Sequence, residues 1–125
     1  MPVKKILIAD DSPSDRQYLL EKLSKHGYQC ITAEGGTEAI AKSKSEHPDL
    51  ILMDVIMPGT NGYEATRTIT RDEATRTIPV ILCTGKDQET DRLWGLRQGA
   101  RDYVTKPVDL NGLLEKIAAF NQEQP

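Results

Sequence analysis

Five polar residues stand at or just after the carboxyl ends of the short apolar segments of this chain. They are Asp10, Asp11, Asp54, Thr84 and Lys106. Asp54 closes the most hydrophobic run, LILM, where burial would penalise the charge of a carboxylate. Three carboxylates, a hydroxyl and an ammonium can together bind a divalent cation and receive a phosphoryl group, with Asp54 as the nucleophile. This chemistry requires a fold that brings the five side chains together.

The alternation of apolar runs with helical patterns predicts such a fold. Strands are expected over residues 4–10, 28–33, 50–54, 79–84 and 102–106. Three of these runs are continuously apolar, as is typical of parallel strands covered on both faces. Helices are expected over 13–26 and 37–46, from about 63, over 87–99, and from 110 to about 121. The order (βα)₅ predicts an α/β, doubly wound parallel sheet with helices on both faces.

The first of these helices carries clear start signals. Ser12 stands at the N-cap, Pro13 at the first helical position and Asp15 at the capping-box position. Gly27 then ends the helix. The pattern places Asp15 as a helix-start residue and gives it no chemical role.

In a doubly wound sheet, ligands bind beyond the carboxyl ends of the strands. The five polar residues are therefore expected to gather at one edge. Three carboxylates at close range repel one another, which raises the pKa of at least one of them unless a cation intervenes. Mg²⁺ binds through one or two carboxylates, water and phosphate oxygens, and Lys106 supplies a further positive charge. The pattern therefore predicts a magnesium and phosphoryl site with Asp54 at its centre.

Composition narrows the class of protein. The chain has 125 residues and a net charge of −3, which predicts one domain over residues 1–121 with a short C-terminal tail at 122–125. It has no basic run for nucleic acid and no apolar segment long enough for a signal peptide or a membrane span. We therefore expect a cytoplasmic protein without membrane insertion. Cys30 and Cys83 are expected as free thiols, because strands lie between them.

The segments IADDS, LILMDVIMPGTNG, PVILCTG and ARDYVTKPV, taken together in this order and spacing, resemble the landmark motifs of the response-regulator receiver domain. The resemblance covers essentially the whole chain and implies the CheY-like, flavodoxin-like fold with strand order 2-1-3-4-5. It implies that Asp54 is the phosphoacceptor. It also implies that Asp11 binds Mg²⁺ directly, that Asp10 acts mostly through water, and that the backbone carbonyl of Ile56 completes the protein ligands.

The same resemblance assigns the switch residues. Thr84 would donate a hydrogen bond to one phosphoryl oxygen and Lys106 would pair with another. The Lys106–Pro107 peptide would be cis, and the rotamer of Tyr103 would follow Thr84. The positions that modulate the lifetime of the phosphorylated form in this family are occupied here by Ile56 and Lys86.

The segments MPGTNGYEATRTI and KDQETDRLWGLRQGARDYVTKPV are similar to the single-domain regulators of type IV pilus chemotaxis systems, the PilH type, tied to twitching motility and phototaxis. This likeness implies a CheA-like histidine kinase as phosphodonor. It implies an output surface formed by residues 87–99, 102–106 and 110–121, which would contact a motor or regulator protein. A role as a phosphate sink, and dimerisation of the monomer on activation, remain open alternatives.

Two other functions are weighed against this one. A Mg²⁺-dependent phosphatase with an aspartyl intermediate typically has two acids separated by one residue and a cap insertion, whereas Asp10 and Asp11 are adjacent and the chain has no room for a cap. A receiver that has lost phosphorylation would lack active-site positions that are present here. We therefore expect a signalling protein that catalyses only its own phosphoryl transfer and slow self-dephosphorylation. Trp94, if exposed, would suggest a docking anchor, and Gly95 indicates either close packing or a helix soft enough to remodel.

Overall fold

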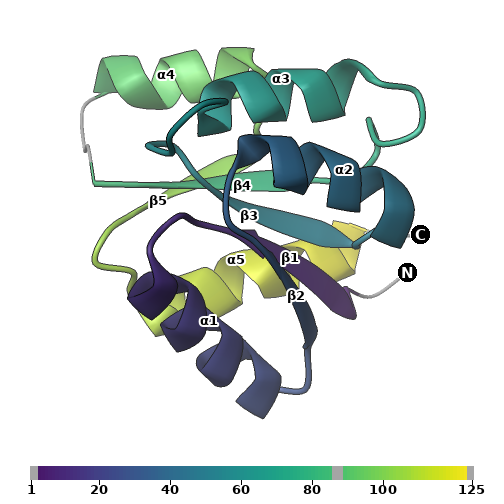
Figure 1. Cartoon of the computed structure of the whole chain (residues 1–125). Helices are drawn as coiled ribbons and strands as arrows, with labels where there is room; N and C mark the ends of the chain where they lie inside the picture. Colours follow the sequence, from purple (N-terminus) through teal and green to yellow (C-terminus); the bar gives the residue numbers. More distant parts are fainter. Residues whose placement is uncertain (1–2, 86–88, 124–125) are drawn as a thin grey trace.

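Five strands and five helices alternate along the described part of the chain (Figure 1). The structure is a computed structural model that describes residues 3–85 and 89–123. The strands are β1 (Lys5–Ala9), β2 (Gln29–Ala33), β3 (Leu50–Asp54), β4 (Val80–Thr84) and β5 (Asp102–Thr105). The helices are α1 (Pro13–Lys25), α2 (Gly36–Glu46), α3 (Gly62–Arg71), α4 (Glu89–Arg97) and α5 (Leu110–Glu123). Each predicted strand is present, with ends that differ by at most one residue.

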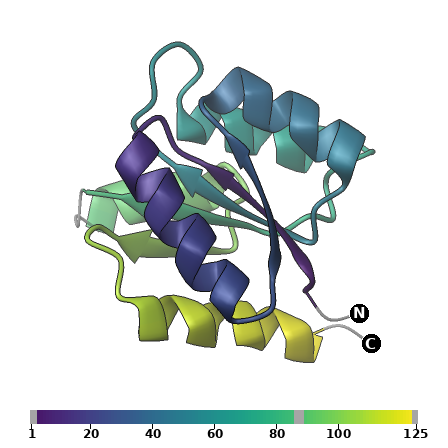
Figure 2. The ribbon, with the colours of Figure 1, turned by 60° about the horizontal axis from the view of Figure 1, so that its bottom comes forward.

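The strands form one parallel sheet in the order β2-β1-β3-β4-β5, which confirms the predicted topology. Helices α1 and α5 cover one face, and α2, α3 and α4 cover the other (Figures 1 and 2). Helix α5 continues two residues beyond the end predicted at 121, because no glycine or proline interrupts good helix formers there. The predicted start of the fourth helix at 87 lies outside the described residues.

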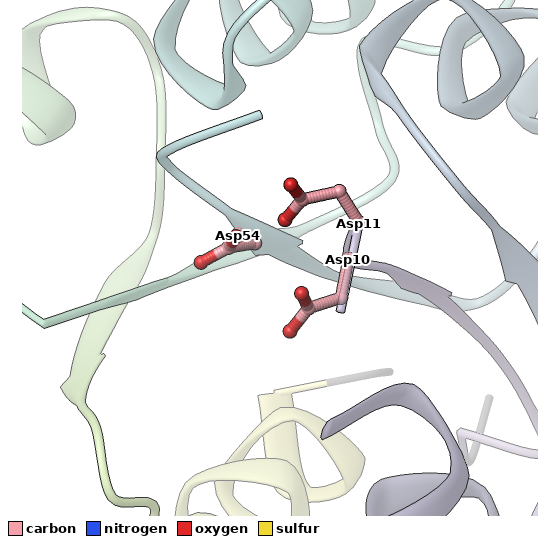
Figure 3. Close-up of side chains that lie close together, drawn as sticks. All are labelled: Asp10, Asp11 and Asp54. Carbon is pink, nitrogen blue, oxygen red and sulfur yellow. The ribbon is translucent and has the colours of Figure 1, made fainter. Parts of the chain in front are cut away.

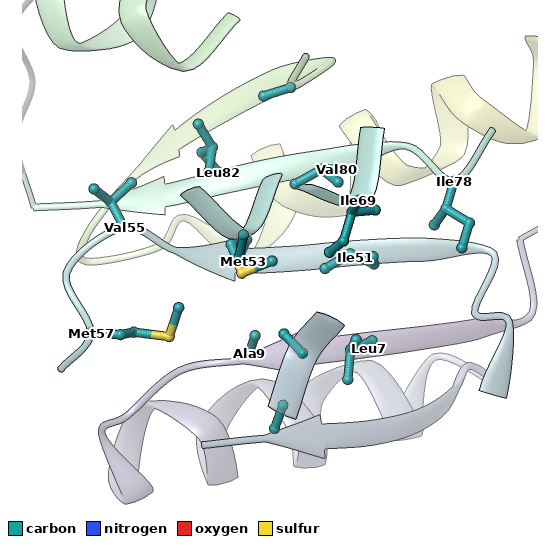
Figure 4. Packing of buried hydrophobic residues seen from close by; sticks show 14 residues of the cluster. Leu7, Ala9, Ile51, Met53, Val55, Met57, Ile69, Ile78, Val80 and Leu82 are labelled. Atoms are coloured by element: carbon teal, nitrogen blue, oxygen red, sulfur yellow. The ribbon is translucent and has the colours of Figure 1, made fainter. Parts of the chain in front are cut away.

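Side chains of the three central strands alternate strictly between two hydrophobic clusters, one on each face of the sheet. The cluster under α2 and α3 takes Leu7, Ala9, Ile51, Met53, Val80 and Leu82 (Figure 4). The cluster under α1 and α5 takes Ile6, Ile8, Leu50, Leu52, Ile81 and Cys83. This alternation explains why these strands are apolar at every position apart from the end residues Lys5, Asp54 and Thr84, because neither face of the sheet meets water there.

Side chains cap the N-termini of two helices, α1 as predicted and also α3. Ser12 Oγ accepts a hydrogen bond from the backbone N–H of Asp15 at 3.3 Å and so caps α1. Asn61 Oδ1 accepts from the N–H of Glu64 at 3.0 Å and caps α3. Both caps lie beside the carboxyl edge of the sheet, and they fix the first turns of the two helices that follow β1 and β3.

Gly95 is explained by close packing. A Cβ atom at this position would overlap with Leu82 Cδ1, and Tyr63 Cε1 would lie 3.4 Å away. Helix α4 therefore approaches β4 at a distance that a larger residue would prevent.

Both cysteines are free thiols, as predicted. Cys83 is buried between the sheet and its helices, and burial raises the pKa of its thiol to about 12. Across residues 3–85 and 89–123, no helix has both the length and the apolar character that crossing a bilayer requires.

Candidate functional site

Three carboxylates meet beyond the carboxyl ends of β1 and β3 (Figure 3). Asp10 and Asp11 follow β1, and Asp54 is the last residue of β3. One oxygen from each of the three lies within 4.8 Å of the others. Asp10 and Asp54 are only 2% and 6% exposed, whereas Asp11 is exposed. The predicted gathering of the acids at one sheet edge is therefore confirmed, with two of the three buried.

Lys106 is the positive centre of this group. Its ammonium nitrogen lies 2.8 Å from Asp10 Oδ2, 3.2 Å from Asp54 Oδ1 and 3.0 Å from Asp15 Oδ2. The first two contacts agree with the predicted gathering of these groups at one sheet edge. The third brings in Asp15 from the first turn of α1, and three carboxylates thus surround one ammonium.

Asp10 accepts hydrogen bonds at both of its carboxylate oxygens and at its backbone carbonyl. Its Oδ1 accepts from the backbone N–H of Ser12 at 2.9 Å, while its Oδ2 takes the bond from Lys106. Its backbone carbonyl accepts from Arg16 Nη1 at 2.7 Å, and Arg16 Nη2 lies 3.3 Å from Glu34 Oε1. Since both carboxylate oxygens of Asp10 already have hydrogen-bond partners, contact with a cation through water suits Asp10 better than direct coordination.

The electrostatics of the site follow from its burial and its like charges. Burial raises the pKa of Asp54 to about 6, the negative charges of Asp10 and Asp11 add to the rise, and Lys106 opposes it. Burial alone would lower the pKa of Lys106, but hydrogen bonds to Asp10 and Asp15 and the charge of Asp54 outweigh it and raise that pKa. The positive charge of Lys106 therefore does not fully offset the negative charges of Asp10 and Asp11 and the burial of Asp54.

The donor set fits a hard divalent cation. Three carboxylate oxygens lie within a span that one small ion can bridge. Burial raises the Asp54 pKa most, and the repulsion among the carboxylates that adds to this rise is relieved when a cation binds. Mg²⁺, whose preferred ligands are such oxygens, suits this edge of the sheet. The residues that would hold it are Asp10, Asp11 and Asp54.

Thr84 ends β4, and Lys106 directly follows the neighbouring strand β5, one residue beyond its end at Thr105. Thr84 is the last residue of β4, is buried, and pairs with Thr105 of β5. The backbone N–H of Lys106 donates to the Thr84 carbonyl at 2.7 Å. Tyr103, which pairs with Leu82 in the same register, is partly buried against the cluster under α2 and α3. The predicted switch residues Thr84 and Tyr103 therefore lie on the adjacent strands β4 and β5.

The loop after Asp54 is shaped by a close backbone approach. The N–H of Gly62 donates to the Val55 carbonyl at 2.9 Å, and a Cβ atom at Gly62 would overlap with the carbonyl oxygen of Asp54. Ile56 lies in this loop with its side chain 62% exposed. The Lys106–Pro107 peptide is cis, as predicted. Lys86, the second position predicted to tune lifetime, lies outside the described residues.

Sequence reasoning missed Asp15 and Arg16. Both stand in the first turn of α1, where the pattern showed only a helix start. A signal was available, because the helix that follows β1 begins at the same sheet edge as the acids. Polar side chains in its first turn are therefore within reach of the site.

Comparisons with known proteins agree with this geometry. A family model described as the response regulator receiver domain matches residues 6–118. Protein PilH of Pseudomonas aeruginosa is 55% identical over 115 residues, which cover 92% of this chain and 95% of PilH. The phosphate regulon transcriptional regulatory protein PhoB of the same species is 41% identical over 93% of this chain, which spans about half (51%) of PhoB. The structure of the Vibrio cholerae chemotaxis protein CheY4 superposes with a TM-score of 0.88 at 30% identity, covering 94% of this chain and 98% of that one.

Proposed function

This chain belongs to the response regulator receiver domain family, and from that premise we propose that it accepts a phosphoryl group on Asp54 from a histidine kinase. As a receiver domain it is part of a two-component system. The observation that carries the proposal is the position of Asp54. It is a buried carboxylate at the end of β3, with Asp10 and Asp11 beside it and Lys106 Nζ 3.2 Å from its Oδ1.

In the transfer step, a carboxylate oxygen of Asp54 forms a bond to the phosphorus of a phosphohistidine as the phosphorus–nitrogen bond breaks. The electron pair stays with the imidazole nitrogen, which takes up a proton. Lys106 neutralises charge on one phosphoryl oxygen, and the Thr84 hydroxyl donates a hydrogen bond to another. Asp10, Asp11, Asp54 and the Ile56 carbonyl would hold Mg²⁺, which would supply further charge neutralisation when bound. Positioning and neutralisation are what phosphoryl transfer chiefly requires.

The chain acts as a signalling protein, and the only reactions it catalyses are its own phosphorylation and a slow self-dephosphorylation. The side chain of Ile56 is apolar and exposed in the loop after Asp54, so it offers no hydrogen bond to orient an attacking water. Lys86 is the second residue assigned to tuning this rate. The phosphorylated form is accordingly long-lived unless a phosphatase acts on it.

Phosphorylation adds about −1.5 to −2 charges at Asp54. These charges draw Thr84 and Lys106 towards the phosphoryl oxygens, and Tyr103 moves into the space that Thr84 leaves. The result is a two-state switch that phosphorylation biases. The buried position of Thr84 and its place on the strand next to Tyr103 support this step.

The surface of α4, β5 and α5 passes the signal to a partner. A groove of about 320 Å³ lies between these elements, with Arg92, Tyr103 and Lys116 among its lining residues. Because Tyr103 lines this groove, its movement changes the shape that a partner meets. On α4, Leu93 and Trp94 are each 51% exposed, and such apolar side chains favour docking of a partner protein.

The likeness to PilH over nearly its whole length favours a chemotaxis-like system of pilus-based twitching motility in the cytoplasm. A CheA-like kinase is the phosphodonor, and the output is a motor or regulator protein, with a role as a phosphate sink as the alternative. We expect a monomer, with dimerisation through α4 and α5 on activation as the second possibility.

Intact mass after incubation with acetyl phosphate tests the proposal, with and without Mg²⁺, for the parent and Asp54→Asn. Glu73→Gln, at an exposed position after α3, is the control for loss of a carboxylate elsewhere. One phosphoryl adduct that requires both Mg²⁺ and Asp54 supports the proposal. Repeated turnover of the donor would instead favour a phosphatase. No adduct from acetyl phosphate or from a phosphorylated CheA-like kinase would indicate a receiver that signals without phosphorylation.

A further inference from the structure

We propose that Asp15 is a positioning residue for phosphoryl transfer, which holds Lys106 on the α1 side of the site and competes with the phosphoryl group for its ammonium. The inference rests on the proposed function, because it concerns the lysine that receives the phosphoryl oxygens. It adds a carboxylate that lies outside the acidic cluster of Asp10, Asp11 and Asp54.

The first argument is the donor capacity of the ammonium. A lysine ammonium has three N–H donors, and Lys106 Nζ lies at 2.8 to 3.2 Å from one oxygen each of Asp10, Asp15 and Asp54. The ammonium therefore donates hydrogen bonds to Asp10 and Asp15 and forms an ion pair with Asp54 before any phosphoryl group arrives. A new bond to a phosphoryl oxygen requires Lys106 to give up or share one of these bonds.

The second argument is which partner can be released. Asp10 is buried, and its carboxylate would be left without water if Lys106 withdrew. The side chain of Asp15 is 50% exposed, against 22% for Lys106. A released Asp15 carboxylate is hydrated at once, so this bond is the least costly of the three to break.

The third argument is the open space beside the pair. A groove of about 720 Å³ runs between α1 and the segment after β5. Asp15 and Lys106 line it together with Tyr18, Pro107 and Val108. The Asp15 side chain therefore has room to move away from Lys106 without repacking the core, while its backbone N–H stays bonded to Ser12 Oγ.

The consequence is a restraint on phosphorylation. Asp15 holds Lys106 on the α1 side of the site, and its negative charge and its share of the ammonium oppose a tetrahedral anion on Asp54. Removal of this carboxylate should tighten anion binding by about two- to fivefold, the range expected for a half-exposed ion pair. Asp15→Glu, which keeps the charge, should stay close to the parent.

The test measures the affinity of the Mg²⁺-loaded full chain for beryllofluoride, an analogue of the phosphoryl group, by the fluorine NMR signals of the bound form. Parent, Asp15→Asn and Asp15→Glu are compared, each with Lys106 present and in a Lys106→Met background. Glu21→Gln, an exposed carboxylate farther along α1, is the matched control. With Lys106 present, we expect beryllofluoride to bind more tightly to Asp15→Asn than to the parent, Asp15→Glu or Glu21→Gln. In the Lys106→Met background, the gain in affinity from Asp15→Asn should be smaller.

Two results would overturn the inference while the proposed function stands. One is equal affinity of the parent and Asp15→Asn. The other is the same gain with and without Lys106, which would make Asp15 a nearby charge and not a partner of the ammonium. If the parent binds no beryllofluoride with Mg²⁺ and gains no phosphoryl group on Asp54, the proposed function fails and this inference fails with it.

Discussion

The ammonium nitrogen of Lys106 lies 3.2 Å from a carboxylate oxygen of Asp54, although β3, which carries Asp54, and β5, which Lys106 directly follows, are not neighbours. β4 lies between β3 and β5 in the sheet, so the lysine side chain reaches across the carboxyl end of a whole strand. The pair is formed without a phosphoryl group. Its positive charge is thus in place before negative charge develops, which is the arrangement that favours catalysis by fixed dipoles and charges.

The raised pKa of Asp54 predicts how stability depends on pH. Its folded value is about 6, against about 3.9 for a free aspartate. Between these values the folded chain holds a proton that the unfolded chain has lost, so stability falls as pH rises through this window. Without metal, Asp54→Asn should be more stable than the parent by about 3 kcal/mol near pH 7.5, and about equal to it near pH 4. Urea unfolding in a chelator at both pH values measures the difference. Parallel pH dependences for parent and variant would contradict the prediction.

Mg²⁺ should stabilise the folded chain, because the acidic cluster forms only on folding. At a concentration of one hundred times its Kd, the gain is about 2.7 kcal/mol. The gain should shrink below about pH 6, where Asp54 is protonated and a poor ligand. Thermal unfolding with Mg²⁺ and with a chelator measures it. Asp11→Asn should lose most of the effect and Glu73→Gln should keep it, and an equal gain in all three chains would argue against this site.

Gly62 should tolerate no side chain. A Cβ atom there would overlap with the Asp54 carbonyl oxygen, a backbone atom that cannot turn aside. Gly62→Ala is therefore expected to cost about 1–3 kcal/mol of unfolding free energy, and to weaken Mg²⁺ binding by displacing Asp54. Gly35→Ala is the control, since a Cβ atom there meets nothing within 4 Å, and it should change stability by less than about 1 kcal/mol. Urea unfolding of both variants checks the contrast, and equal losses would disprove it.

Ile56 should set the lifetime of the phosphorylated form. Its exposed apolar side chain cannot position water at the phosphorus, whereas an amide can donate and accept hydrogen bonds there. Ile56→Asn is expected to speed phosphate loss by at least about tenfold, and by no more than the roughly 10²–10⁴-fold that a positioned acid or base supplies. Ile56→Leu, which stays apolar, should keep the parent rate. The decay of the phosphorylated mass after removal of the donor measures both, and an unchanged or slower rate for Ile56→Asn would refute the role.

The sequence alone predicts the strands and the edge at which the acids meet, and the reasons are local. Apolar runs such as Leu50–Met53 indicate strands covered on both faces, and parallel strands must end at the same edge. Asp54 could therefore be placed beside Asp10 without coordinates. Strand direction and hydrophobic periodicity are enough for this placement, and both can be read from short segments of the sequence.

The contact between Asp15 and Lys106 could not be predicted in this way. The two residues lie 91 positions apart, and no strand register joins them. Their approach depends on how α1 packs beside the segment after β5, which is decided by side chains of the cluster under α1 and α5 such as Leu19 and Leu113. For the same reason, the pattern at Asp15 suggested only the capping of a helix, and its partner became visible only once the tertiary packing was known.

The strict alternation of the central strands between two hydrophobic clusters limits how this chain can change in length. In β3, Leu50 and Leu52 face one cluster while Ile51 and Met53 face the other. One residue inserted or deleted within the strand would exchange the two sets and turn the following carboxylate to the opposite face of the sheet. Substitutions that keep volume can accumulate in these strands, but insertions and deletions are confined to the loops and helix ends. Related chains should therefore align across β1, β3 and β4 without gaps, however far their surfaces have diverged.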